Sequence, residues 1–405
     1  MNSHHLYVHV PFCRLVCAYC DFVTVAGRRD DIPRYVEALL AEMSMRPAPG
    51  KLDTVYFGGG TPSLFPASAV ERLLQAAIDR WRRSPSEVTI EANPSGRETP
   101  DWAAVRAAGV NRVSLGVQSL RDDDLRTLAR GHTAAEARDA YRAARRAGFE
   151  SVSIDLIYGI PGQSLGGWKR GLREAIALQL DHISLYTLSL TLAPDEWAAP
   201  PRGGALRWRR RLATRQSDDV AADQYRLAED ELAAAGYRHY ELSSWARPGF
   251  ESRHNLAYWA RRPYTGIGAG AHSYDGDAVR SWNVRDLDRY LAGVRGGDRP
   301  VDGSEQLDRE ARMFEAVMLG LRRVDGFSRA EFRSEYGIDP VEWRRDAAAR
   351  ASKTGLLEIS RDHLRLTREG RLLADTVLVE YLAEPAPSAH LEAKRETGKA
   401  LAAAR

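Results

Sequence analysis

The chain has 405 residues, of which 44% are hydrophobic and 28% are charged, and its formal net charge is +3. This length and composition suit a globular protein of two domains, and the near-balanced charge excludes a global basic field for nucleic acid. The first residues lack the basic and apolar regions of a signal peptide, and no apolar run is long enough to span a membrane. We therefore expect a cytoplasmic protein with no membrane span and no nucleic-acid partner.

Short β-branched and aromatic runs alternate with longer alanine- and arginine-rich segments along much of the chain. The short runs predict strands at residues 5–10, 54–58, 87–91, 112–117, 151–158 and 182–188. Helices are expected between them, at residues 32–45, 68–81, 102–108 and 134–147. Repeated strand–helix units form a parallel sheet covered by helices, which fits either a doubly wound sheet or an incomplete barrel.

The pattern changes beyond about residue 300. Helices are predicted at 309–321, 341–353 and 368–382, with a small hairpin formed by residues 357–360 and 363–366. Helices with a small hairpin resemble a winged-helix module, a fold that does not by itself specify a role. We expect a barrel at residues 1–290, a small α+β domain at 300–382, and a disordered tail at 383–405, which is rich in Ala, Pro, Lys and Glu.

All three cysteines of the chain, Cys13, Cys17 and Cys20, lie in one eight-residue window after the first predicted strand. An odd number of cysteines in a cytoplasmic chain does not fit a disulfide framework, and a structural zinc site would need a fourth ligand from elsewhere. Three thiolates on a short loop can instead each hold one iron of a [4Fe–4S] cluster. The fourth iron then has no protein ligand and is open to a substrate or cofactor.

Glycines and polar residues follow the other predicted strands, close to the carboxyl end of each. Parallel α/β folds build their active sites at this edge, so we expect one shared site. Glycine lets the backbone approach a ligand closely, and carboxylates, amides and guanidinium groups can bind ribose hydroxyls, an amino group and a carboxylate. The residues expected at this site are Gly59, Gly60, Thr61, Glu91, Gln118, Arg130, Asp155 and Ser189.

Two further segments have ordinary explanations. The run Gly-Ile-Gly-Ala-Gly-Ala at 266–271 superficially suggests a dinucleotide-binding loop, but no clear strand precedes it and no well-placed acidic residue follows it. The arginine-rich segment at 207–215 is interpreted as a solvated surface rather than a nucleic-acid patch.

The CxxxCxxC loop, with Tyr19 before its last cysteine, and the later Gly-Gly-Gly-Thr-Pro run resemble the radical S-adenosylmethionine (SAM) superfamily. The resemblance extends over nearly the whole chain and implies an incomplete parallel (β/α)6 barrel of TIM-like form. It also implies a [4Fe–4S] cluster on the three cysteines, with SAM at the open iron. By that likeness the SAM pocket is lined by Tyr7, Tyr19, Gly59, Gly60, Thr61, Glu91, Gln118, Arg130, Asp155 and Ser189.

Within the superfamily, the motifs resemble the coproporphyrinogen-oxidase-like branch, and the segment His-Asn-Leu-Ala-Tyr-Trp at 254–259 resembles the HNxxYW signature of HemW-type haem chaperones. Oxygen-independent coproporphyrinogen III oxidases carry a fourth cysteine where this chain has Phe22. The resemblance implies a chaperone that binds haem and passes it to acceptor haem proteins, respiratory or membrane-associated. By this resemblance the neutral imidazole of His254 would be the axial ligand of haem iron, and Tyr258 and Trp259 would lie against the porphyrin. The alternative is that His254 is a hydrogen-bonded structural histidine and that the two aromatic residues belong to the core.

Two enzymatic functions stay open beside the chaperone. One is oxidative decarboxylation of the propionates of coproporphyrinogen III. The other is radical chemistry on another tetrapyrrole, such as haem ring opening, against which the HNxxYW match speaks. No residue is assigned a catalytic role from the sequence. A nucleic-acid-binding function rests only on the winged-helix-like segment and the arginine-rich run.

Overall fold

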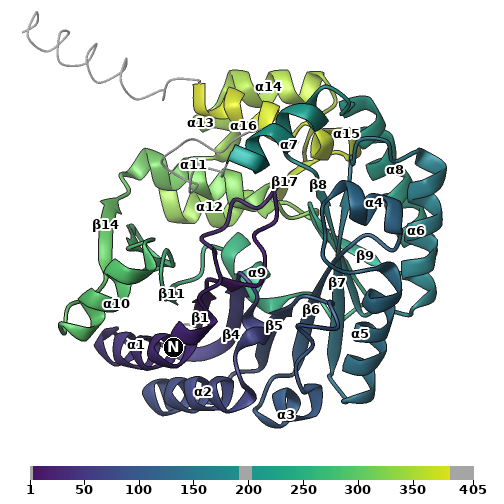
Figure 1. Cartoon of the computed structure of the whole chain (residues 1–405). Helices are drawn as coiled ribbons and strands as arrows, with labels where there is room; N and C mark the ends of the chain where they lie inside the picture. The colour runs from purple at the N-terminus through teal and green to yellow at the C-terminus, as the bar shows by residue number, and fades with distance from the viewer. Residues whose placement is uncertain (1–2, 191–202, 384–405) are drawn as a thin grey trace, which may run out of the picture. The chain divides into compact units, whose positions relative to one another are not determined.

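The computed structural model describes residues 3–190 and 203–383 (Figure 1). The chain forms two compact units. The first contains the described residues up to His239 with Ser243–Tyr258 and Arg262–Gln306; the second contains Tyr240–Leu242, Trp259–Arg261 and the described residues from Leu307 onward. The sequence predicts a disordered tail, and its residues beyond 383 lie outside the described part of the chain. None of the helices in the described ranges is both long enough and apolar enough to cross a membrane.

The first unit is built on six neighbouring parallel strands. These are β1 (Ser3–Val10), β4 (Lys51–Gly59), β5 (Glu87–Ala92), β6 (Arg112–Gln118), β7 (Ser151–Tyr158) and β8 (His182–Thr187). Helices alternate with the strands and cover the outer face of the sheet (Figure 1): α1 (Ile32–Met45), α2 (Ala67–Trp81), α3 (Trp102–Ala107), α5 (Ala134–Arg146) and α6 (Leu165–Ala177). The sheet curves into an incomplete (β/α)6 barrel, which confirms the predicted fold class.

The sheet continues at both edges, which the sequence did not predict. Beside β1 lies the parallel strand β11 (Tyr264–Ile267), followed by the antiparallel strands β12 (His272–Tyr274), β13 (Val279–Asn283) and β14 (Val301–Gln306). Beyond β8 lie β10 (Ser244–Ala246) and β9 (Arg238–Glu241). Strand β11 therefore leads into the glycine run at 266–271 and includes its first two residues, so the expectation that no clear strand precedes the run is wrong. Only four residues form β11, one of them glycine, so its propensity signal is weak.

Strand β1 shows how the two faces of the sheet differ. Its even-numbered side chains face the helices: His4 stacks on Trp81 of α2 with 5.7 Å between ring centroids. The remaining even-numbered side chains are fully buried hydrophobic residues, namely Leu6, Val8 and Val10. Because side chains alternate along a strand, the odd-numbered residues face the barrel interior, and these are polar or aromatic: His5, Tyr7 and His9.

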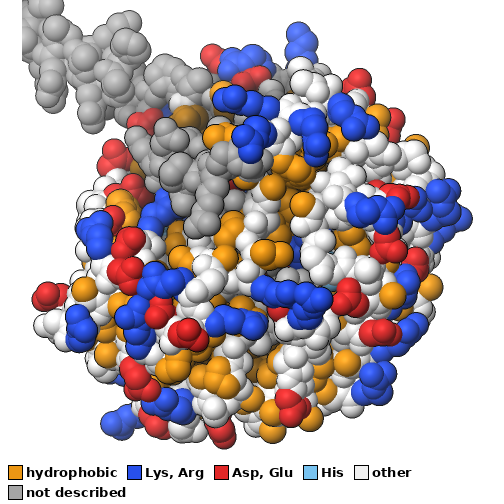
Figure 2. All heavy atoms as spheres, in the orientation of Figure 1, with side chains coloured by type: hydrophobic (Ala, Val, Ile, Leu, Met, Phe, Trp, Pro, Cys, Tyr) orange, Lys and Arg blue, Asp and Glu red, His pale blue; other side chains and the backbone are white. Residues whose placement is uncertain are grey.

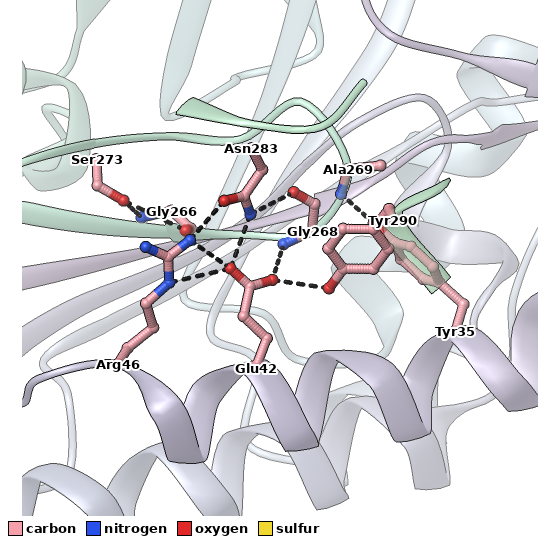
Figure 3. A network of polar contacts seen from close by, with 9 residues as sticks. All are labelled: Tyr35, Glu42, Arg46, Gly266, Gly268, Ala269, Ser273, Asn283 and Tyr290. Atoms are coloured by element: carbon pink, nitrogen blue, oxygen red, sulfur yellow. Dashed lines mark hydrogen bonds and ion pairs between the residues drawn. The ribbon is translucent and has the colours of Figure 1, made fainter. Parts of the chain in front are cut away.

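A buried polar network joins α1 to the strands beside β1 (Figure 3). The Glu42 carboxylate is fully buried and accepts hydrogen bonds from Arg46 (2.6 Å), Asn283 (2.7 Å), the Gly268 backbone (2.8 Å) and Tyr290 (2.7 Å). Gly268 has a φ of +103°, and a Cβ there would lie 2.6 Å from the backbone oxygen of His9 in β1. The glycine run thus serves close packing against β1.

The second unit contains a three-stranded antiparallel sheet, in the order β15 (Phe327–Ser328), β17 (His363–Leu366) and β16 (Leu357–Ile359). Its helices are α11 (Arg309–Gly320), α12 (Arg329–Tyr336), α13 (Pro340–Trp343), α14 (Arg345–Lys353), α15 (Arg368–Leu372) and α16 (Ala374–Ala383). They share a separate hydrophobic core that includes the buried side chains of Val317, Trp343 and Tyr381. This small α+β arrangement agrees with the predicted winged-helix-like fold.

We expect Glu42→Ala to lower the free energy of unfolding by about 3–5 kcal/mol, because it leaves the buried Arg46 guanidinium without its carboxylate. Glu37→Ala is the matched control on the same helix: Glu37 pairs with Arg72 on the surface, where ion pairs contribute little. Urea denaturation measures both. Equal losses in the two variants would contradict a special role for the buried network.

Candidate functional site

The cysteine loop connects two short strands at the carboxyl end of β1. These strands, β2 (Phe12–Cys13) and β3 (Val25–Ala26), pair in parallel, and the Val25 amide donates to the Pro11 carbonyl at 2.8 Å. The Cys20 amide donates to the Cys17 carbonyl at 3.1 Å, which closes a turn between the last two cysteines. The loop lies at the centre of the face in view (Figure 1), where hydrophobic side chains gather among lysines and arginines (Figure 2).

A cavity of ≈ 360 Å³ lies between this loop and the carboxyl ends of the barrel strands. It brings together most of the residues that the sequence placed in one site. Those that line it are Cys13, Cys17, Tyr19, Cys20, Gly59, Gly60, Thr61, Glu91, Gln118, Arg130, Asp155 and Ser189. Tyr7 is not among the lining residues: it lies on β1, and its hydroxyl is 3.1 Å from His9 Nδ1.

The glycine turn after β4 lies directly against the cysteine loop. Gly59 has a φ of +114°, and a Cβ on it would lie 2.5 Å from the His9 ring. A Cβ on Gly60 would lie 2.9 Å from Cys13 Sγ, and the Thr61 hydroxyl is 3.6 Å from the same sulfur. Larger residues would therefore push the turn away from the loop, so glycine is required at both positions.

Two half-buried carboxyl groups face the cavity from β5 and β7. Glu91 accepts hydrogen bonds from the Tyr56 hydroxyl (2.8 Å) and the Gly59 backbone (2.9 Å), and burial raises its pKa to about 7. Asp155 lies 3.3 Å from the Ser114 hydroxyl, and burial raises its pKa to about 6. Both pKa values lie far enough above the ordinary range that each carboxyl changes charge near neutral pH.

Arg130 places a half-buried positive charge beside the cysteines. Its guanidinium donates to Cys17 Sγ at 3.0 Å and to the Tyr19 hydroxyl at 3.3 Å. It also donates to the Gly116 carbonyl at 2.9 Å, which holds it against β6. At the end of the same strand, Gln118 has a φ of +66°, a backbone conformation uncommon for a residue with a side chain and often found at functional sites.

The donor set of the loop fits an iron–sulfur cluster. Without metal, burial raises the pKa of Cys13 to about 12 and that of Cys20 to about 11; bound iron would reverse this by deprotonating the thiols. In residues 3–190 and 203–383, no three His, Cys, Asp or Glu side chains form a group that could hold a metal ion. A four-iron cluster does not require such a group, because each thiolate binds a different iron.

The three residues predicted to bind haem, His254, Tyr258 and Trp259, do not line the cavity. His254 lies on α9 (Arg253–Trp259), is only 1% exposed, and has partners at both ring nitrogens: Thr54 at 2.6 Å and Tyr258 at 2.9 Å. Trp259 belongs to the second unit, where the Arg322 guanidinium lies 4.6 Å from its ring centroid. Binding of iron by His254 would first require loss of one of its hydrogen bonds.

The arginine-rich segment is mostly exposed, as the sequence predicts, but through one buried residue, Arg209, it holds the cysteine loop. It forms α7 (Gly203–Ala213), and its Arg209 is 2% exposed. Arg209 donates to the Ala18 carbonyl at 2.9 Å and to the Asp21 carboxylate at 2.6 Å, on either side of Cys20. The apolar residues Trp208 and Leu212, four positions apart on one helix face, were the signal that this helix is packed.

Comparison with known proteins shows the family to which the chain belongs. A family model for the radical SAM superfamily matches residues 7–174, and one for the HemN C-terminal domain matches residues 307–373. Over 386 residues the chain is 40% identical to the heme chaperone HemW of Mycobacterium tuberculosis, covering 92% of this chain and 93% of that protein. The chain belongs to the HemW family.

Other HemW proteins align with almost all of this HemW-family chain. The heme chaperone HemW of Lactococcus lactis is 34% identical over 377 residues, and that of Escherichia coli is 33% identical over 391 residues; these cover 93% and 94% of this chain and 96% and 98% of the relatives. A solved structure of coproporphyrinogen III oxidase (HemN) from Escherichia coli matches with a TM-score of 0.79 and 22% identity, over 94% of this chain and 90% of that one. That likeness shows the radical SAM fold.

In this HemW-family protein, Arg209→Ala should loosen the cysteine loop, because it removes a buried charge-assisted pair and a bond to the loop backbone. We expect Cys20 in cluster-free protein to react about tenfold faster with a thiol reagent, as the loss of one strong hydrogen bond implies. Arg210→Ala, at the exposed neighbouring position, is the control and should react like wild type. An unchanged rate in Arg209→Ala would show that α7 does not hold the loop.

Proposed function

We propose that this HemW-family protein is a haem chaperone that binds haem and passes it to acceptor haem proteins, including respiratory or membrane-associated ones. The observation that carries the proposal is its near full-length similarity to proteins named heme chaperone HemW. The cysteine loop supports it: at the position of the fourth cysteine of coproporphyrinogen oxidases, this chain has Phe22, which is 67% exposed. We assign the function to the cytoplasm, where thiols stay reduced and can hold a cluster.

We further propose that the cavity holds a [4Fe–4S] cluster and SAM. Cys13, Cys17 and Cys20 would bind the cluster, which when bound supplies an electron and one iron open to the amino and carboxylate groups of SAM. The Arg130 guanidinium offsets the negative charge of the thiolates at short range. Glu91 and Asp155 would accept hydrogen bonds from ribose hydroxyls or the amino group, since both carboxyls face the cavity.

The assignment of haem to His254, Tyr258 and Trp259 stays a prediction. Its physical basis is that a neutral imidazole is a common axial ligand and that aromatic faces suit a porphyrin. Burial lowers the pKa of His254 well below its ordinary value, so the ring is neutral. Its burial and its two hydrogen bonds, however, require an opening of α9 before haem iron could reach it.

A second candidate function is oxygen-independent oxidation of coproporphyrinogen III. The observation that favours it is the fold shared with coproporphyrinogen III oxidase (HemN), and fold alone does not set activity. In this candidate the cavity and its cluster would act on a substrate at the exposed side of the cysteine loop, and the protein would consume SAM. The absence of a fourth cysteine from the chain speaks against it.

Binding of SAM should depend on the charge of Glu91. A carboxylate accepts stronger hydrogen bonds from ribose hydroxyls than a carboxylic acid does, and the pKa of Glu91 is about 7. Affinity should therefore be low where Glu91 is protonated and rise as the pH increases through 7. Calorimetry on reconstituted protein measures the SAM affinity as a function of pH. Glu91→Gln should remove the increase in affinity near pH 7 and leave the increase near pH 6 that is due to Asp155. An identical profile in Glu91→Gln would exclude Glu91 from the SAM site.

Carrier and catalyst can be separated on the reconstituted protein under anaerobic conditions. We expect stoichiometric haem binding and transfer of that haem to an apo-haem protein, without formation of a vinyl product from coproporphyrinogen III in the presence of SAM and a reductant. Cys13→Ala lacks one cluster ligand and should lose the brown cluster absorbance, which tests the cluster separately. Vinyl product formed by the pure protein would overturn the chaperone proposal.

A further inference from the structure

The barrel interior next to the cavity is filled by a column of polar and aromatic side chains. Neighbouring strands β1 and β4 supply it in register, because His5 pairs with Thr54 and Tyr7 with Tyr56. Since side chains two apart on a strand face the same side, these residues form successive layers toward the cavity. Barrel interiors are more often filled by branched aliphatic side chains, so this composition calls for a physical explanation.

His254 lies at the base of the column. Glu87 at the start of β5 holds the first turn of α9, accepting hydrogen bonds from the Arg253 amide (3.2 Å) and the His254 amide (3.0 Å). The fully buried Thr54 hydroxyl lies between two imidazoles, 2.8 Å from His5 Nδ1 and 2.6 Å from His254 Nδ1. The backbone of His254 is thus attached to β5 and its ring to β4, and Thr54 links that ring to His5 on β1.

The hydrogen bonds also indicate where the protons lie. A hydroxyl has one hydrogen, so Thr54 donates to one imidazole and accepts from the other. His5 Nε2 is buried with no partner among the described residues; an unpaired acceptor costs less than an unpaired N–H, so His5 carries its proton on Nδ1. Thr54 then donates to His254 Nδ1, and His254 Nε2–H donates to Tyr258. Neither nitrogen of His254 keeps a free lone pair for a metal.

Tyr56 connects this base to the cavity. Its ring lies 5.1 Å from the His254 ring and 6.2 Å from the Tyr7 ring, centroid to centroid, so it is packed from two sides. Its hydroxyl donates to Glu91 at 2.8 Å, and the other oxygen of Glu91 holds the Gly59 amide at 2.9 Å. A displacement of the Tyr56 ring would therefore move the carboxyl group and the glycine turn that line the cavity.

We infer that His254 is a positioning residue, which fixes Tyr56 and through it the Glu91 carboxylate and the Gly59 turn. In this role His254 supports two residues that line the cavity, Glu91 and Gly59, and this role replaces the one predicted for it as a haem ligand. The inference concerns the SAM site and so rests on the proposed function for one of its readouts. The other readout, exchange of the Gly59 amide, needs no bound ligand.

The test compares His254→Ala, His254→Gln and Tyr56→Phe with wild type. We expect His254→Ala and Tyr56→Phe each to weaken SAM binding about tenfold, as the loss of one hydrogen bond to a carboxylate implies. Because both act through the same hydrogen bond, the double variant should be no weaker than either single one. His254→Gln keeps a polar group near Nε2 and should retain affinity within about threefold. In a hemin titration, the haem spectrum and affinity of His254→Ala should match wild type.

The matched control is His4→Ala, a histidine equally buried on β1 that faces α2 instead of the interior. Amide exchange at Gly59 should become faster in His254→Ala and not in His4→Ala. Three results would each overturn the inference. The first is that the losses of SAM affinity add in the double variant, and the second is that Tyr56→Phe binds SAM like wild type. The third is that His254→Ala has a changed haem spectrum but normal SAM binding. If wild type binds no SAM, the proposed function fails, and amide exchange at Gly59 then tests the inference by itself. Faster exchange in His254→Ala but not in His4→Ala supports the inference. Equal exchange rates in the two variants overturn it.

Discussion

The position of the cysteine loop depends on His9, the last inward-facing residue of β1. Its Nε2 lies 2.8 Å from the Val23 carbonyl after the third cysteine, and its Nδ1 lies 3.1 Å from the Tyr7 hydroxyl. Burial lowers the pKa of His9 to about 4, so the ring is neutral and donates one hydrogen bond while accepting another. The glycine turns at Gly59 and Gly268 pass so close to His9 that neither could carry a Cβ.

Two carboxylates hold these turns, the fully buried Glu42 and the half-buried Glu91. Glu91 accepts from the Gly59 amide and Glu42 accepts from the Gly268 amide, at 2.9 Å and 2.8 Å. The two groups differ in charge balance: Glu42 is paired with Arg46, whereas Glu91 has a hydroxyl partner, Tyr56, and a raised pKa. One carboxylate is therefore suited to structure, and the other to a ligand that brings its own hydrogen-bond donors or positive charge.

Much of the fold and of the site could be predicted from local patterns. Strand β7 was predicted at its observed bounds, and the other five barrel strands within a few residues, because their β-branched runs are continuous. The site residues on strand ends could be grouped because parallel strands bring their carboxyl ends to one edge. The added strands at the β1 edge escaped prediction, since β11 and β12 have only four and three residues. The role of Arg209 escaped it because charge within an arginine-rich run gives no sign of which arginine is buried.

The sequence by itself determined the barrel and the family and predicted a cluster on the cysteines, because spacing, periodicity and motifs are properties of neighbouring residues. Only the tertiary structure decided what His254 contacts. Its partners Thr54 and Tyr56 lie some 200 positions earlier in the chain and meet it because β4 and α9 share the barrel interior. A histidine that could serve as a ligand by its chemistry is thereby buried with both nitrogens paired, and burial and pairing depend on contacts that no local pattern contains.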